Sequence, residues 1–259
     1  MLLAIDIGNT HTVFGVYDGP QLKADWRVSS NTQRTEDEIG AQLQQFLRSG
    51  AIDPGEISAI GISSVVPDLT DIFTQMANKY FRLEPIVVGS DLDLGIAIRY
   101  DDPSAVGADR ICNAIAGYRK YGGPLIIVDF GTATTYDIIA GNGDYLGGVI
   151  APGVETSAAD LHRRAAKLPK IELHLPGKAL GTDTVGSMQA GILFGAIDSL
   201  EGMVTRLQGE IRKREGKEAK VIATGGFSGL ISSQTSVIAA CEPTLVLEGV
   251  RLIVDRVSV

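Results

Sequence analysis

The sequence predicts an α/β protein made of two similar halves, and two observations indicate this. First, predicted strands and helices alternate along most of the 259 residues, which is typical of layered α/β folds. Second, one short signature occurs twice, an apolar run followed by Asp, then Gly and Thr. The copies are LLAIDIGNT at residues 2–10 and LIIVDFGTATT at residues 125–135. A repeated strand and turn, about half the chain apart, predicts an N-terminal domain at residues 1–118 and a C-terminal domain at residues 119–259.

The elements of the first half follow from the spacing of apolar residues and from breaker residues. Thr35 and Glu38 form a capping-box pattern, which predicts a helix that ends at Gly50. Asp68 is predicted to cap the next helix. In order, we expect strands at residues 2–7, 12–17 and about 22–28, a helix at 35–50, a strand at 57–66 ending at Pro67, a helix from Asp68 to about Tyr80, a short strand at 85–89, and a helix that begins at Ser104 or Gly107.

The second half repeats the plan. We expect strands at residues 125–129, about 134–140 and 145–149, a helix at 155–166, a long helix from about 182 to 214, a strand at 221–224 leading into Gly225 and Gly226, and a last helix at about 245–255. Gly191 and Gly195 lie one turn apart in the long helix, so another helix could pack closely there if it faces this side.

Bulk properties exclude several classes of function. The formal net charge of −8 argues against binding to nucleic acid or to an anionic membrane surface. The N-terminal apolar run is interrupted at Asp6, so it is predicted to be a strand and not a signal peptide, and no apolar run has the length of a membrane span. Cys112 and Cys241 form no CxxC pair, which favours two reduced, buried thiols in a cytoplasmic protein.

The repeated signature has the chemistry of a phosphate-binding turn. An Asp after a buried strand places a carboxylate at the strand end, glycine lets the backbone approach a ligand, and Thr supplies a hydroxyl and an N–H. Two such turns could hold the phosphates and the metal of ATP from both sides. The chain has neither the G-x-x-x-x-G-K-[ST] loop nor the motif set of protein kinases, so the turns would replace those devices.

Further segments narrow this interpretation to one family. They are Tyr100 followed by GADR at residues 107–110, DFGTATT at 129–135 and GGVIAPG at 147–153. Together with DIGNT at residues 6–10, they resemble the type III pantothenate kinases of the acetate and sugar kinase, Hsp70 and actin superfamily, over essentially the whole chain. The resemblance implies two ribonuclease-H-like domains that face each other across a nucleotide cleft. It also implies ATP-dependent phosphorylation of pantothenate to 4'-phosphopantothenate, the first step of coenzyme A biosynthesis.

The resemblance also implies roles for single residues. Asp109 would be the catalytic base toward the pantothenate hydroxyl, kept ionised by the helix N-terminus; from the residues alone, it is an acidic residue in the first turn of a helix. The implied substrate contacts are Tyr100, Gly107, Ala108, Asp109, Arg110 and Thr184, and the implied ATP and phosphate contacts are Asp6, Ile7, Gly8, Asn9, Thr10, His11, Thr12, Val13 and Thr132. Arg110 offers a planar fork for the pantothenate carboxylate.

Cofactors and assembly follow from the same resemblance. Asp6 would hold Mg²⁺, through water, and Asp129 would bind a monovalent cation, K⁺ or NH₄⁺. The family implies a homodimer, with Thr184 reaching the substrate from the partner subunit and helix 182–214 as the candidate interface.

The residues alone leave alternatives. Asp129 could be a turn cap, Thr184 a helix cap, and Gly225 and Gly226 a simple strand-to-helix turn. A sugar kinase of the same superfamily and a non-catalytic regulatory protein remain as other functions. A polyol pocket would not need Arg110, and the presence of Asp6, Asp109 and Asp129 together favours the enzyme.

Overall fold

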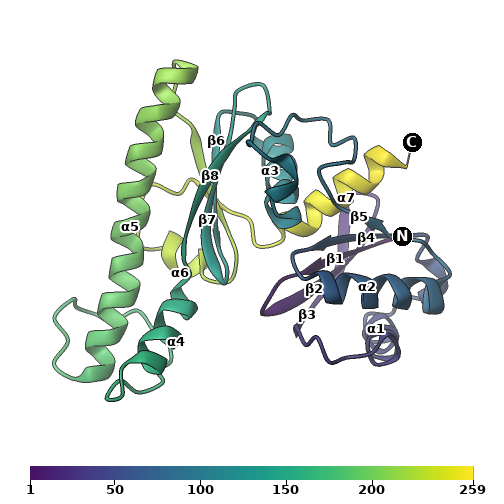
Figure 1. The fold of residues 1–259 in the computed structure, drawn as a ribbon, viewed down its shortest axis with the longest axis horizontal. Helices are drawn as coiled ribbons and strands as arrows, with labels where there is room; N and C mark the ends of the chain where they lie inside the picture. Colours follow the sequence, from purple (N-terminus) through teal and green to yellow (C-terminus); the bar gives the residue numbers. More distant parts are fainter. Residues whose placement is uncertain (259) are drawn as a thin grey trace. The chain divides into compact units, whose positions relative to one another are not determined.

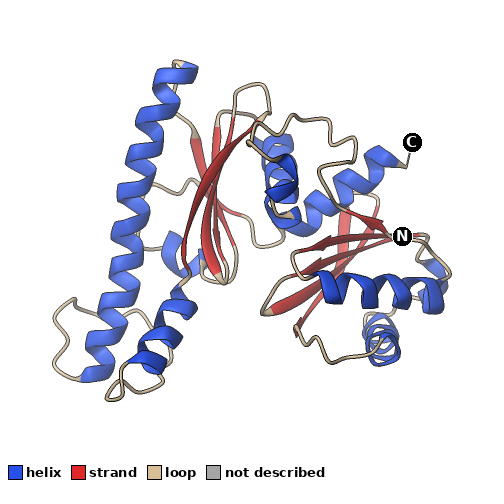
Figure 2. Cartoon of the chain, viewed as in Figure 1, coloured by secondary structure: helices blue, strands red, loops and turns tan. Residues whose placement is uncertain are grey.

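The structure, a computed structural model that describes residues 1–258, contains two five-stranded mixed sheets with the same strand order (Figures 1 and 2). The first runs β3 (Gln21–Ser29), β2 (His11–Asp18), β1 (Leu2–Ile7), β4 (Ala59–Ser64), β5 (Ile86–Val87). The second runs β8 (Tyr145–Pro152), β7 (Ala133–Ile139), β6 (Leu125–Phe130), β9 (Lys220–Thr224), β10 (Ala240–Cys241). In each sheet the signature strand, β1 or β6, pairs antiparallel with the next strand and parallel with a later one. The two copies of the sequence signature therefore lie in two sheets that have the same topology.

Helices cover both faces of the first sheet. On one face, α1 (Glu36–Ser49) and α2 (Pro67–Met76) bury an apolar core with side chains of β1, β2 and β4. On the other face lies α7 (Leu245–Val257), which packs on β1 and β4. A side chain at Gly61 would lie 2.6 Å from atoms of Val250 and Val254. Because glycine has no side chain, α7 can approach the sheet closely at this position.

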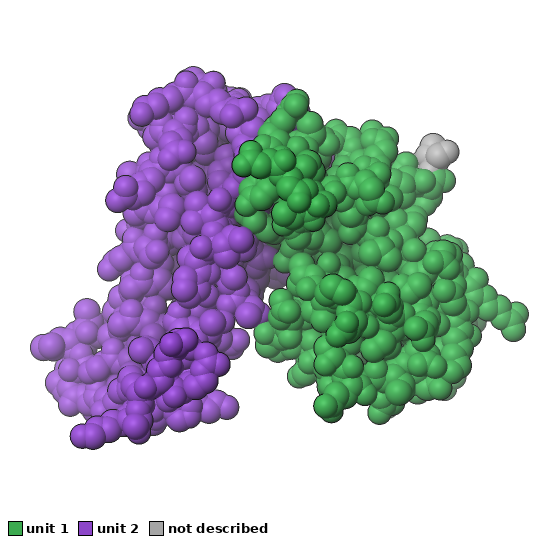
Figure 3. Space-filling view, viewed as in Figure 1, with its two compact units in different colours: residues 1–116, 244–259 green, residues 117–243 purple. Residues whose placement is uncertain are grey.

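The position of α7 differs from the expected domain boundaries. The chain forms two compact units, residues 1–116 with the C-terminal segment from Thr244 on, and residues 117–243 (Figure 3). The sequence analysis assigned the last helix to the second half because it follows that half in the chain. The apolar face of α7, including Leu247, Val250 and Val254, is buried instead on the first sheet.

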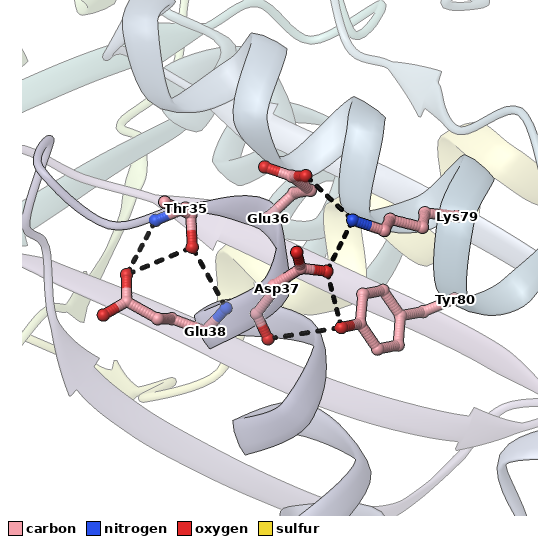
Figure 4. Close-up of polar contacts among 6 residues, drawn as sticks. All are labelled: Thr35, Glu36, Asp37, Glu38, Lys79 and Tyr80. Atoms are coloured by element: carbon pink, nitrogen blue, oxygen red, sulfur yellow. Dashed lines mark hydrogen bonds and ion pairs between the residues drawn. The ribbon is translucent and has the colours of Figure 1, made fainter.

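The helix α1 begins as the capping box predicts. The Glu38 backbone N–H donates to Thr35 Oγ1 at 3.3 Å, and the Thr35 N–H donates to Glu38 Oε2 at 2.8 Å (Figure 4). Lys79, in the π-helical turn after α2 (Ala77–Phe81), contacts Glu36 at 3.0 Å and Asp37 at 2.6 Å. These contacts raise the pKa of Lys79 and lower the pKa of both carboxyl groups. The network ties the start of α1 to the end of α2.

The helix α2 has no side-chain cap. Its N-cap residue is Val66, Pro67 occupies the first turn, and Asp68 lies inside that turn. The expectation that Asp68 caps this helix was wrong, because Pro67 fixes a helical φ and already starts the helix one residue earlier. Short 3-10 turns at Pro54–Glu56 and Pro103–Ala105 were also not expected.

In the second unit, α4 (Val154–Arg164) and the 32-residue α5 (Thr184–Glu215) cover one face of the sheet. The short α6 (Ser228–Ser232) follows β9. The helix α3 (Ala108–Tyr121) begins in the first unit, and from Gly117 on it belongs to the second. Among residues 1–258, no helix combines the length and apolar character that crossing a membrane requires.

Candidate active site

The first signature turn connects β1 to β2 and is held by Ser30. The Gly8 N–H donates to the His11 carbonyl at 3.0 Å and closes the turn. The Ser30 hydroxyl donates to the Gly8 carbonyl at 2.6 Å and lies 2.9 Å from the Thr12 hydroxyl. Asn9, Thr10 and His11 are exposed, whereas Ile7 and Thr12 are buried. Of the expected phosphate contacts, Ile7 and Thr12 therefore lie below the surface of the structure.

Asp6 lies at the end of β1, beside a hydroxyl group. Ser63 is its register partner on the parallel strand β4, and the Ser63 hydroxyl donates to Asp6 Oδ1 at 3.0 Å. Ser63 is fully buried and Asp6 is half-buried. This hydrogen bond fixes the rotation of the Asp6 carboxylate, and therefore the direction of its second oxygen.

Asp109 lies in the first turn of α3. Its Oδ1 accepts the Arg110 N–H at 2.8 Å. A side chain at Gly107 would lie 2.5 Å from Asp109 Oδ1, so the glycine leaves space for the carboxylate. One turn along the helix, burial and then the carboxylates of Asp6 and Asp109 raise the pKa of the Cys112 thiol. Asp6 and Asp109 are far apart in the sequence, yet both carboxylates act on this one buried thiol. Cys241, which was also expected to be buried, is exposed.

Burial raises the pKa of Asp109 above the ordinary value of an aspartate, and the hydrogen bond from Arg110 opposes this shift. The helix N-terminus was expected to keep Asp109 ionised. The burial effect is larger, because the carboxylate loses water on entering the space beside β4. A raised pKa makes the ionised carboxylate a better proton acceptor than an ordinary aspartate.

Gly107, Ala108 and Arg110, three other expected acceptor contacts, are chain neighbours of this carboxylate. Gly107 and Ala108 line a cavity of about 520 Å³ between the ends of β4 and β5 and the start of α3. Its wall is mostly apolar, with Val65, Val88 and Val106. Arg110 is buried and Tyr100 is 37% exposed.

The second signature turn, between β6 and β7, repeats the first. The Gly131 N–H donates to the Ala133 carbonyl at 3.1 Å, and the Thr156 hydroxyl donates to the Thr132 carbonyl at 2.6 Å. Gly225 has a φ of +88°, and a side chain there would collide with Asp129 Oδ1. The glycine after β9 therefore fits directly against the carboxylate of the expected cation ligand.

Thr184 is the first residue of α5. The cap of this helix is Asp183, which accepts the Gly186 N–H at 2.8 Å, so the Thr184 hydroxyl is not needed as a cap. Thr184 is exposed and lines a groove of about 1470 Å³ along α4 and α5. Gly191 and Gly195 line the same groove, and a side chain at either would meet no atom within 4 Å.

Candidate cation ligands are single carboxylates. Within residues 1–258, no group of three or more His, Cys, Asp or Glu side chains could hold a metal ion. Asp6 and Asp129 each offer oxygen at a strand end, and oxygen is the ligand atom that Mg²⁺ and K⁺ take. The donor set fits a Mg²⁺ ion that keeps waters and takes its remaining ligands from a nucleotide.

The comparisons with known proteins agree with this geometry. The chain matches the family model of type III pantothenate kinases over residues 2–206. It is 47% identical over 256 residues to a type III pantothenate kinase of Moorella thermoacetica, covering 99% of both chains. It is also 47% identical over 257 residues to one of Geobacter sulfurreducens, again covering 99% of both. The chain belongs to the type III pantothenate kinase family.

Solved structures support the fold. A protein from Campylobacter jejuni described as a Baf family transcriptional activator has a TM-score of 0.59 at 20% identity, covering 98% of both chains. The activator of 2-hydroxyisocaproyl-CoA dehydratase from Clostridium difficile, solved with ADPNP, has a TM-score of 0.51 at 13% identity, covering 99% of this chain and 95% of that one. At these identities the likeness concerns the fold alone. The expected α/β fold with two similar halves is confirmed.

Sequence reasoning missed several supporting residues in this member of the pantothenate kinase family. Ser30 and Ser63 stand in strand or loop segments without any motif, so only the strand register identifies them. Gly153 was quoted as part of GGVIAPG without a role. A side chain there would collide with the carbonyls of Gly131 and Thr132, so this glycine allows the second turn to pack against the start of α4.

Proposed function

We propose that this chain catalyses the ATP-dependent phosphorylation of pantothenate to 4'-phosphopantothenate, which makes it an alcohol phosphotransferase of coenzyme A biosynthesis. Membership of the type III pantothenate kinase family supports the substrates. The observation that carries the proposal at the site is that the carboxylates of Asp6 and Asp109 both act electrostatically on the buried Cys112 thiol. One carboxylate stands at the phosphate turn, where Ser63 donates to it, and the other stands within the segment expected to bind the acceptor.

Asp109 would act as the base. It would accept a hydrogen bond from the primary hydroxyl of pantothenate, orient that oxygen toward the γ-phosphate, and take the proton late. This suffices because phosphoryl transfer has a loose transition state with little need for a strong nucleophile. Arg110, Tyr100, Gly107 and Ala108 would position the acceptor, with the guanidinium of Arg110 binding its carboxylate.

Backbone N–H groups and hydroxyls of residues 6–13, together with Thr132, would hold the phosphates of ATP. Asp6 would hold Mg²⁺ through water, and Asp129 would hold K⁺ or NH₄⁺. Bound there, the cations would supply positive charge that offsets the phosphate charges during transfer. The protein supplies little positive charge in the first turn, where Val13 follows the exposed residues.

We further propose a homodimer that buries the groove of α4 and α5. The groove is lined by small residues of α5, among them Gly191 and Gly195, and by Leu161, which is 41% exposed. Small residues allow close helix approach and the exposed apolar side chains gain from burial. Thr184 lies in this groove, so the partner subunit would bring it to the substrate.

The test is ADP release, measured in a coupled assay with ATP, Mg²⁺ and pantothenate, first with K⁺ and then with Na⁺. We expect turnover that requires pantothenate and is faster with K⁺. Absence of pantothenate-dependent turnover in both salts, from a folded protein, would refute the proposed substrate. Equal rates in the two salts would refute the role given to Asp129.

A further inference from the structure

The buried hydroxyl beside Asp6 is built into the sheet. Ser63 lies on β4, the strand parallel to β1, and is fully buried. Its hydroxyl donates to Asp6 Oδ1 at 3.0 Å. A strand-borne serine has one short χ1 bond, so its hydroxyl is more rigidly placed than that of a longer side chain or a loop residue.

The second sheet repeats this arrangement. The register partner of Asp129 on the parallel strand β9 is Thr224, just as the register partner of Asp6 on β4 is Ser63. Both hydroxyl residues are buried, with 0% and 2% of their surface exposed. Two sheets of equal topology therefore place a buried hydroxyl residue beside the carboxylate of each signature turn.

The Asp6 carboxylate sets the direction of the Ser63 hydrogen. An ionised carboxylate only accepts hydrogen bonds, so the Ser63 hydrogen points to Asp6. The Asp6 carboxylate also acts electrostatically on the buried Cys112 thiol of α3. The helix α3 packs closely on α7 at this point, since a side chain at Gly249 would collide with the Cys112 carbonyl.

We infer that Ser63 is a positioning residue for the Asp6 carboxylate, and that it determines how well the first turn binds nucleotide in the presence of Mg²⁺. The inference rests on the proposed function for the identity of the ligand. Ser63 touches no substrate in this scheme. It acts through Asp6, because its hydrogen bond to one carboxylate oxygen fixes the direction of the other.

The test is the affinity for ATP, measured by titration calorimetry with Mg²⁺ and with EDTA, in the absence of pantothenate. For Ser63→Ala we expect the Kd for ATP with Mg²⁺ to rise about 10-fold, the size of one lost hydrogen bond to a charged group. The Kd with EDTA should change far less. Ser63→Thr keeps the hydroxyl and should restore the Mg²⁺ dependence. Ser49→Ala removes a hydroxyl that bonds only the Phe46 carbonyl at the end of α1, and it serves as the matched control.

A double-mutant cycle separates positioning from a general loss of structure. If Ser63 acts through Asp6, Asp6→Asn and the double variant Asp6→Asn with Ser63→Ala should bind ATP with Mg²⁺ equally weakly. Additive losses would overturn the inference, and so would a Ser63→Ala Kd within two-fold of wild type. A wild-type chain that binds ATP with Mg²⁺ but does not phosphorylate pantothenate would refute the proposed function, while the cycle would still decide the role of Ser63. A wild-type chain that binds no ATP would refute both.

Discussion

At the scale of single residues, the burial of Asp109, the proposed base, lowers the stability of the fold. Because burial raises the pKa of Asp109, the folded chain holds this proton more tightly than the unfolded chain does. Between the ordinary aspartate pKa and the raised folded pKa, the free energy of unfolding must fall as pH rises. At pH values above both the folded and the unfolded pKa, the ionised, half-buried carboxylate lowers the free energy of unfolding by a constant amount. The enzyme would tolerate this loss of stability because the carboxylate is a usable base.

The first prediction follows from this fall in the free energy of unfolding as pH rises. We expect Asp109→Asn to lose most turnover, and to be at least as stable as wild type at neutral pH because an amide has no charge to bury. The stability advantage should vanish in acid, below the ordinary aspartate pKa. Thermal unfolding across pH, together with the coupled assay, measures both effects. Wild-type turnover would remove Asp109 as the base, and a variant that is less stable than wild type at neutral pH would contradict the buried-charge argument.

A second residue-scale prediction concerns Gly225. Gly225→Ala would put a side chain into the space of Asp129 Oδ1, at a φ of +88° that L residues rarely adopt. We expect about 1–3 kcal/mol of lost stability and a higher K⁺ concentration for half-maximal activity. Gly209→Ala, at an open and exposed position in α5, is the control and should be neutral or stabilising. If a folded Gly225→Ala variant needs the same K⁺ concentration as wild type, the turn at Gly225 does not contribute to the cation site.

At the scale of elements, patterns local in sequence predicted structure well. The capping box of Thr35 and Glu38, the period of the strands and the Gly216 that ends α5 all act within a few residues, so the chain encodes them directly. The packing partner of α7 is not local. On the first sheet α7 meets Gly15 and Gly61, where the lack of a side chain leaves space for Leu247, Val250 and Val254. These contacts join strands and a helix that are far apart in the sequence.

The same distinction holds in the candidate site. The turns and their carboxylates were predicted because each is one continuous motif. The role of Ser63 depends on which residue of β4 lies opposite Asp6, and a shift of the register by one residue would replace its hydroxyl with the side chain of a neighbour. Strand register is a property of the whole sheet, so no pattern near Ser63 could have identified it.

The capping box gives a prediction at this scale. We expect Thr35→Ala to lower the free energy of unfolding by about 1 kcal/mol, because the Glu38 N–H loses its acceptor at the first turn of α1. Thr35→Ser should retain most of the stability, since it keeps the hydroxyl. Urea unfolding of the three proteins measures the difference. Equal midpoints for all three would mean that the contacts of Lys79 with Glu36 and Asp37 alone hold this end of α1.

At the scale of the whole molecule, the chain is a duplicated sheet whose two copies have diverged at the strand ends. In the first copy, the register partner of the turn carboxylate is a serine and the strand continues into α2 through Pro67. In the second, the partner is a threonine and the strand continues through Gly225. The two copies share a carboxylate and a hydroxyl residue, whereas the segments after them differ.

The last prediction tests assembly and site together. If Thr184 serves the site of the partner subunit, a heterodimer of Asp109→Asn and Thr184→Val chains contains one site with both groups intact. Equal mixing with free exchange places half of the chains in heterodimers, so about a quarter of wild-type activity should return from two inactive proteins. Subunits are exchanged in dilute denaturant and assayed after its removal, with each variant treated alone as the control. If Thr184 acts within its own subunit, no heterodimer has an intact site and the mixture stays inactive. An active Thr184→Val protein would instead show that this hydroxyl, although it lines the groove of α5, is not needed for the reaction.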